Sequence, residues 1–213
     1  MKIQDYFKRW RVVRLTPFAQ KRSVFSLLRL YGRLDRDIER FKKSTGIKCA
    51  AGCGRCCENP EVETTVLECL PIAVELWRQN QAEDWLKKAE ARQLSGPCVF
   101  YQPHPHMPGH GRCSVYPWRP LICRLFGFSA NTDKNNQTTF VTCATIKKLY
   151  ADQYIETQTR IGKGLSIPAM FSYSLEVMNI NPELGKKQLP INEAIKIAIE
   201  KVGLFNVLLK SRR

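Results

Sequence analysis

The stretch Cys49-Ala-Ala-Gly-Cys53-Gly-Arg-Cys56-Cys57 decides how the rest of the chain has to fold, because it places four thiols within nine residues. Its spacing is C-x3-C-x2-C-C. Thiolates are the ligands that zinc and iron–sulfur clusters prefer, whereas so dense a run of cysteines would make a poor apolar core. The stretch therefore predicts a metal centre in a loop whose small residues let the backbone fold around an ion.

Four more cysteines follow singly, so the fold has to bring them back to the 49–57 loop. Neighbouring side chains diverge, and Cys56 and Cys57 are therefore expected to serve two ions or to bridge them. We predict two four-thiolate sites or one binuclear site, with metal binding contributing directly to folding. The spacing suits zinc and iron equally, and an iron–sulfur cluster stays open. The expected ligands are Cys49, Cys53, Cys56, Cys57, Cys98, Cys113, Cys123 and Cys143.

The ninth cysteine and the three histidines are predicted to lie outside the metal site. Cys69 occupies an apolar helical position in Val-Leu-Glu-Cys-Leu-Pro, which favours core packing. His104, His106 and His110 fall in one loop rich in proline and glycine. An exposed hairpin loop is favoured over ligation there, because the eight cysteines already suffice.

Length and composition are typical of a globular chain with a core of its own. Of the 213 residues, 44% are hydrophobic, which suits one domain with extensions or two small domains. No uncharged apolar run reaches the roughly 18 residues of a membrane span, and the first residues lack the apolar core of a secretory signal. We therefore expect a cytoplasmic protein, where reduced thiols favour metal over disulfides. The Arg-rich start leaves an organelle transit peptide open, with Asp5 against it.

The net charge of +15 comes entirely from the two ends of the chain. Residues 1–48 hold 14 basic and 4 acidic residues, residues 186–213 hold 7 and 2, and the middle holds 13 of each. Basic flanks predict contact with an anionic membrane surface, a nucleic acid or an acidic protein. A surface role is favoured for residues 7–14, whereas the apolar stripe of the 18–43 helix favours packing.

Hydrophobic periodicity predicts a mostly helical α+β protein. It has a small cysteine-rich, metal-centred core with a short hairpin, flanked by N- and C-terminal amphipathic helices. The expected domains are a basic arm and helix (1–45), a cysteine-cluster domain (46–150) and a helical extension packed on the core (151–213). Helices are expected at 18–43, 64–79, 83–94, 145–161, 168–178 and 192–210. Strands are expected at 98–101, 112–116 and 138–142, and a linker at 185–190.

A second sequence motif makes the resemblance to one protein family specific. The run Cys113-Ser-Val-Tyr116-Pro-Trp-Arg119-Pro120-Leu-Ile-Cys123-Arg124-Leu-Phe126 has the pattern C-x2-Y-x2-R-P-x2-C-R. Together with the 49–57 stretch, Cys98 and Cys143, it resembles the YkgJ-like cysteine-cluster family over roughly residues 45–150. The resemblance implies a CxxCxxCC-type domain that chelates zinc or iron. Some larger proteins with such a domain are associated with lysine methylation in flagellin, which implies an alternative, an iron–sulfur enzyme or accessory factor in protein modification.

Other catalytic classes fit less well. C-x3-C-x2-C alone is also the signature of radical S-adenosylmethionine enzymes, but no βα alternation follows Cys56. Neither paired catalytic carboxylates, a Ser/His/Asp set nor a phosphate-binding loop is visible. Whether the chain is an enzyme stays open at this point. Arg119 and Arg124 suit two roles equally, either neutralising the thiolates or an anion, or binding loop carbonyls.

Overall fold

Residues 18–92 and 96–210 are described by a computed structural model, in which helices predominate. The predicted class, a mostly helical α+β protein, is confirmed, while the basic run at 7–14 lies outside the described residues. None of the described helices is long and apolar enough to cross a membrane. The helices are α2 (Phe18–Thr45), α3 (Arg55–Glu58), α4 (Val66–Arg78), α5 (Ala82–Ala91), α6 (Leu121–Leu125), α7 (Ala144–Leu149), α8 (Ala151–Gly162), α9 (Met170–Ile180), α10 (Pro182–Gly185) and α11 (Ile191–Lys210).

The described strands form short antiparallel pairs, one of which joins segments that are far apart in the sequence. They are β1 (Glu63–Thr65) with β6 (Gln188–Pro190), β2 (Tyr101–Pro103) with β3 (Gly111–Cys113), and β4 (Ser129–Thr132) with β5 (Thr138–Val141). The predicted hairpin is present, although its strands lie closer to the turn than expected. The predicted linker at 185–190 is wrong, because its second half is strand β6.

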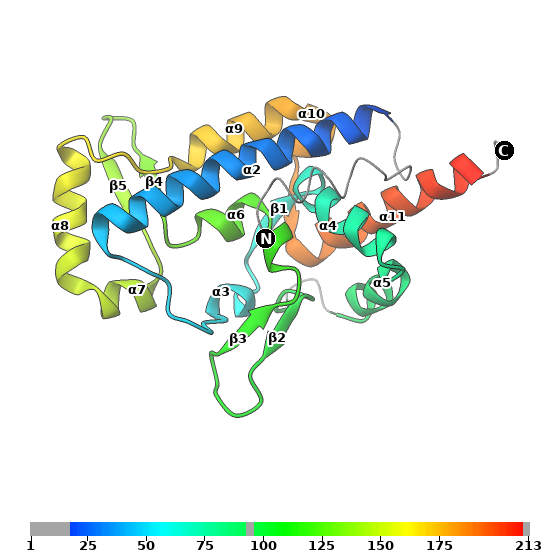
Figure 1. Cartoon of the computed structure of the whole chain (residues 1–213), viewed down its shortest axis with the longest axis horizontal. Coiled ribbons are helices and arrows are strands. Elements are labelled where there is room, and N and C mark those ends of the chain that lie inside the picture. The colour runs from blue at the N-terminus through cyan, green and yellow to red at the C-terminus, as the bar shows by residue number, and fades with distance from the viewer. Residues whose placement is uncertain (1–17, 93–95, 211–213) are drawn as a thin grey trace.

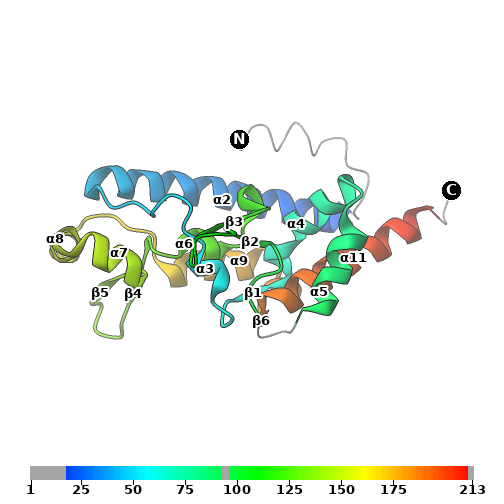
Figure 2. The same cartoon turned by 90° about the horizontal axis from the view of Figure 1, so that it is seen from below.

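The helices form an elongated molecule with α2 along its length (Figure 1). Helices α4, α5 and α11 gather at one end, and α7, α8 and the β4–β5 pair at the other, in both views (Figures 1 and 2). The β2–β3 hairpin projects from the side opposite α2 and α9 (Figure 1). Helix α3 and helix α6 lie between the two ends, so the cysteine loop occupies the middle of the molecule.

Helix α2 forms because apolar residues recur every three or four positions along it. This stripe is buried, and charged residues occupy the other side. The helix ends at Thr45, and Gly46 follows with φ of 74°, a left-handed conformation that glycine adopts without strain. The predicted stripe is thus confirmed as core, and it comprises Val24, Leu27, Leu28, Tyr31, Leu34, Ile38 and Phe41.

Helix α4 begins with a side-chain cap. Thr65 and Glu68 form a capping box, in which each side chain accepts a hydrogen bond from the other's backbone N–H. Glu68 also accepts a hydrogen bond from the Leu121 backbone at 2.9 Å, although it is buried. Burial raises the pKa of the Glu68 carboxyl. One side chain therefore both starts α4 and fixes the start of α6, which carries Cys123.

Helix α4 and helix α11 pack through Trp77. The Trp77 indole N–H donates to the Ile199 carbonyl at 2.9 Å. Gly203, one turn further along α11, leaves space for the indole ring, since a Cβ there would lie 2.5 Å from the Trp77 Cζ2 atom. The glycine is therefore explained by the close approach of the two helices.

The replacement Gly203→Ala is expected to lower the free energy of unfolding by about 1–3 kcal/mol, because overpacking outweighs the better helix propensity of alanine. The matched control is Gly162→Ala in α8, where a new Cβ has no neighbour within 4 Å. It should leave stability unchanged or raise it by up to about 1 kcal/mol. Denaturant unfolding of both variants checks this, and equal stability of the two would contradict the packing argument.

Candidate metal centre

One cavity of about 1090 Å³ occupies the middle of the molecule, and all eight predicted ligands line it. Its wall combines the second half of α2, the 46–57 loop, the β2–β3 hairpin, the 115–128 segment and the starts of α7 and α11. Cys69 is not among the lining residues and is fully buried in the core, as predicted. The fold therefore brings together Cys49, Cys53, Cys56, Cys57, Cys98, Cys113, Cys123 and Cys143, which span 95 positions of sequence.

The 49–57 loop is held against the β2–β3 hairpin. The Tyr101 ring lies so close to Gly54 and Gly111 that a Cβ at either position would come within 2.4 Å of it. Its hydroxyl donates to Glu58 at 2.9 Å and approaches the His110 carbonyl at 3.0 Å. The predicted loop also contains a helical turn, α3, which starts at Arg55 and includes Cys56 and Cys57. Gly54 thus lets Tyr101 pack against this loop because it has no side chain, in addition to giving the backbone conformational freedom.

Cys98 is positioned by a residue that sequence reasoning missed. Asn192, buried in the first turn of α11, accepts a hydrogen bond from the Val99 N–H at 2.8 Å and donates to the Pro97 carbonyl at 3.2 Å. The Cys98 N–H donates to the Cys57 carbonyl at 2.9 Å, which joins two of the predicted ligands. No local pattern marks Asn192, because its partners lie more than 90 positions away.

Cys143 caps helix α7, where its sulfur accepts a hydrogen bond from the Ile146 N–H at 3.4 Å. The predicted helix at 145–161 is wrong as a single element, since it is divided into α7 and α8. Tyr150 has a non-helical backbone at the break, and its partly buried side chain packs against the core. The break turns α8 away from α7, so that Cys143 lies at the start of a short, separate helix.

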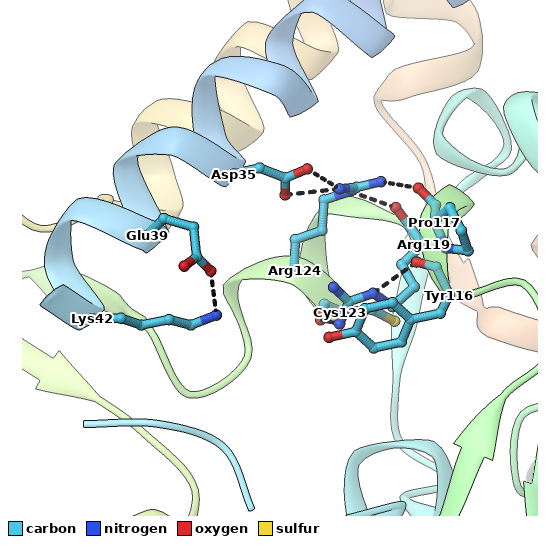
Figure 3. A network of polar contacts seen from close by, with 8 residues as sticks. All are labelled: Asp35, Glu39, Lys42, Tyr116, Pro117, Arg119, Cys123 and Arg124. Carbon is cyan, nitrogen blue, oxygen red and sulfur yellow. Dashed lines mark hydrogen bonds and ion pairs between the residues drawn. The ribbon is translucent and has the colours of Figure 1, made fainter. Parts of the chain in front are cut away.

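Arg124 binds loop carbonyls, which is one of the two roles considered for it, and so acts as a structural clamp. Its guanidinium is buried and binds both Asp35 carboxylate oxygens, at 2.8 and 2.7 Å. It also donates to the Arg119 and Pro117 carbonyls, at 2.9 and 2.6 Å (Figure 3). The clamp therefore ties the loop before Cys123 to helix α2.

Arg119 lies at the cavity itself. Its guanidinium carbon sits 3.5 Å from the centre of the Tyr116 ring, a cation–π contact. The side chain donates to the Tyr116 carbonyl at 3.0 Å and to the Cys123 carbonyl at 3.1 Å (Figure 3). It is thus held by loop carbonyls and also contributes positive charge next to the thiols.

The thiols fall into two neighbourhoods. Cys49 is within electrostatic reach of Cys53, Cys56 and Cys143, and shares a hydrogen bond with the first of these. The second neighbourhood is centred on Cys113, which shares a hydrogen bond with Cys57. The charges of Cys98 and Cys113 also act on Cys123. Cys56 lies between the two sets, since its charge acts on Cys49, Cys98 and Cys123.

Burial and neighbouring charge set the acidity of these thiols. Burial raises the pKa of Cys98 to about 12 and that of Cys49 to about 11. A hydrogen bond from Cys57 lowers the pKa of Cys56, and the Arg119 charge lowers it further against the effect of burial. The pKa of Cys113 is also lowered, by its hydrogen bond with Cys57 and by the Arg119 charge, so Cys56 and Cys113 both favour the thiolate.

Several cations line the cavity without a carboxylate partner. Asp35 and Glu39 also line it, but they pair with Arg124 and Lys42. Eight thiolates around two divalent ions would carry a net charge of about −4, which these cations offset. The lining cations with no ion pair among the described residues are Lys43, Lys48, Arg55, Arg112 and Arg119.

The donor set fits a soft metal, and the geometry is open. All nine cysteines are free thiols. Within residues 18–92 and 96–210, no three His, Cys, Asp or Glu side chains are arranged to hold one ion as they stand. His104, His106 and His110 lie in the β2–β3 loop and are not among the cavity-lining residues. The described structure therefore gathers the thiols on one cavity without arranging three of them around a single ion.

Comparison with known proteins confirms the resemblance drawn from the sequence. Residues 48–144 match the family model CxxCxxCC, described as "Putative zinc- or iron-chelating domain". The matched segment begins next to Cys49 and ends next to Cys143, so it contains every predicted ligand. No curated protein and no solved structure gives a significant match to the chain.

Proposed function

We propose that residues 48–144, which match the CxxCxxCC family model, bind zinc or iron through eight cysteines in the central cavity. The observation that carries the proposal is the gathering of all eight thiols, from segments far apart in the sequence, on one cavity. Cys69 serves as the internal comparison, since this ninth thiol is buried in the core and does not line the cavity. Soft thiolates in such numbers are suited to zinc, or to iron in a cluster.

We further propose that the centre has two four-thiolate subsites. The grouping of Cys53, Cys56 and Cys143 around Cys49 supports this division. The contact between Cys56 and Cys57 joins the two subsites. The first subsite would use Cys49, Cys53, Cys56 and Cys143, and the second Cys57, Cys98, Cys113 and Cys123. The position of Cys56 between the two sets would also let it bridge two ions. Four thiolates complete the coordination of a structural zinc ion.

Anaerobic purification with elemental analysis and a visible spectrum tests the proposal. We expect about two metal ions per chain, because each subsite offers the four ligands that zinc takes. A colourless protein with zinc indicates structural sites, whereas a brown protein with inorganic sulfide indicates a cluster. A full-length, folded protein that keeps no metal after aerobic and anaerobic preparation, and takes up none on addition, would sink the assignment.

The size of the cavity favours a second candidate, an iron–sulfur enzyme or accessory factor in protein modification, such as lysine methylation. A volume of about 1090 Å³ exceeds what two ions need and is slightly above the roughly 300–1,000 Å³ of typical small-molecule sites. Part of the wall is apolar, with Phe100, Phe126 and Phe128 among its residues. The two candidates differ in a simple observable, since the enzyme requires a cluster whose absorption changes on reduction.

The basic flanks support a further part of the proposal, contact with an anionic partner. The excess of positive charge lies in residues 1–48 and 186–213, so we place the contact with the partner on these flanks and not on the cysteine segment between them. Such contact is expected to weaken steeply with salt, because it depends on exposed charges.

A further inference from the structure

Helix α2 carries a line of unpaired cations on its outward face. Arg22, Arg29, Arg36 and Lys43 are spaced seven residues apart, and all four are exposed. Lys43, at one end of the line, also lines the central cavity, whereas the three arginines do not. Residues seven apart lie on nearly the same side of a helix, so the line extends over roughly 30 Å. None of the four forms an ion pair among the described residues.

The other cations of this helix differ from the line. Arg33 pairs with Glu176 on α9, and Arg40 pairs with Asp37. The buried stripe of α2 lies on the opposite side of the helix and packs on the core. The line is therefore a single-sign surface, with its neighbouring charges already neutralised.

Helix α9 adds exposed apolar side chains next to this surface. It contacts α2 through the Arg33 pair and through a hydrogen bond from the Tyr173 hydroxyl to Asp37. The two helices lie together on the side of the molecule opposite the β2–β3 hairpin (Figure 1). Tyr173 is buried, whereas Phe171 and Leu175 point away from the core, with 75% and 40% of their surface exposed. By helix geometry they share the outward side with the cation line.

We propose that this face, formed by the cation line and by Phe171 and Leu175, docks on an anionic membrane surface. The proposal rests on the anionic partner proposed above, and it names the surface and the partner. A long row of cations beside exposed Phe and Leu matches a lipid interface, where headgroup charge attracts the cations and apolar side chains enter the acyl boundary. A nucleic acid would account for the cations, but it gives no reason to expose Leu175.

The test uses the full-length, metal-loaded protein and sedimentation with phosphatidylcholine vesicles, with and without phosphatidylserine. We expect binding only to vesicles that contain phosphatidylserine, and its loss at high salt. The double variant Arg29→Glu/Arg36→Glu should bind at least about tenfold more weakly, since each removed cation is worth about a factor of five or more. The variant Phe171→Ser/Leu175→Ser should bind several-fold more weakly at the same ionic strength.

The matched control is Lys87→Glu/Lys186→Glu, which makes the same change of charge at exposed, unpaired lysines on other elements. It should keep most of the vesicle binding. All of these residues are exposed, so circular dichroism and melting should match wild type. Control binding as weak as that of the α2 variant would show only a general charge effect and would overturn the proposal.

Binding experiments with nucleic acids distinguish failure of the membrane proposal from failure of the broader proposal that the partner is anionic. The same variants are tested by fluorescence anisotropy with duplex DNA and single-stranded RNA. Binding of nucleic acid through Arg29 and Arg36 without phosphatidylserine-dependent vesicle binding would overturn the membrane proposal and keep the anionic partner. Absence of binding to either probe at low salt would overturn both.

Discussion

Replacing Cys53 by serine is expected to remove about one metal ion per chain and to lower the melting temperature by about 10 °C. A serine hydroxyl is a poor ligand for a soft metal, so the first subsite loses one of its four thiolates. Metal binding that depends on folding stabilises the folded state, and its loss costs several kcal/mol. Elemental analysis and thermal unfolding of the purified variant measure the two effects together.

Cys69→Ala is the matched control for this experiment. Cys69 is fully buried in α4, so its truncation should cost about 1–2 kcal/mol through lost packing. Its metal content should nevertheless equal that of the wild type, because the thiol lies outside the cavity lining. Equal metal content in the Cys53 and Cys69 variants would refute the ligand assignment.

Cys113→Ser extends the experiment to the division into subsites. Cys113 belongs to the second neighbourhood, so this variant should lose the other ion and keep the one bound near Cys53. A double variant, Cys53→Ser/Cys113→Ser, should hold almost no metal. Loss of all metal from either single variant would instead indicate one binuclear centre with a bridging thiolate.

The sequence predicted those features that depend on local chemistry. The α2 stripe follows from spacing along one helix, which a single sequence displays directly. The difference between Cys69 and the other cysteines also came from local context, an apolar helix as opposed to a glycine-rich loop. Thiol density then sufficed to identify the lining of the cavity.

The features that the sequence did not predict depend on distant partners. Strand β6 has only three residues, and its pairing with β1 across more than 120 positions leaves no local pattern. Asn192 positions Cys98 from an unremarkable place in the first turn of α11. Gly54 and Gly111 look like ordinary loop glycines until Tyr101 packs against both. Hydrogen bonds and close approaches between remote segments thus bring together the cysteines that the sequence proposes as ligands.

Arg124→Ala is expected to lower the free energy of unfolding by about 3 kcal/mol. The guanidinium is only 5% exposed and makes four hydrogen bonds, and truncation leaves the Arg119 and Pro117 carbonyls without this donor. A buried acceptor without a partner costs about 1–3 kcal/mol. Asp35 is 42% exposed and can return to water, which keeps the loss at the lower end of the range for broken buried ion pairs. Denaturant unfolding measures the loss.

Two further variants test whether the planar, forked shape of the buried guanidinium accounts for this loss of stability. Arg124→Lys keeps the charge, but its ammonium cannot reach the carboxylate and both carbonyls in the same plane, so most of the loss should remain. Arg40→Ala removes another arginine that pairs with an aspartate of α2, but at 78% exposure it should cost less than about 0.5 kcal/mol. If Arg124→Ala were as stable as Arg40→Ala, the clamp could not be what fixes the Cys123 loop. The thiolates would then have to hold that loop through the metal, and chelation should destabilise the variant far more than the wild type.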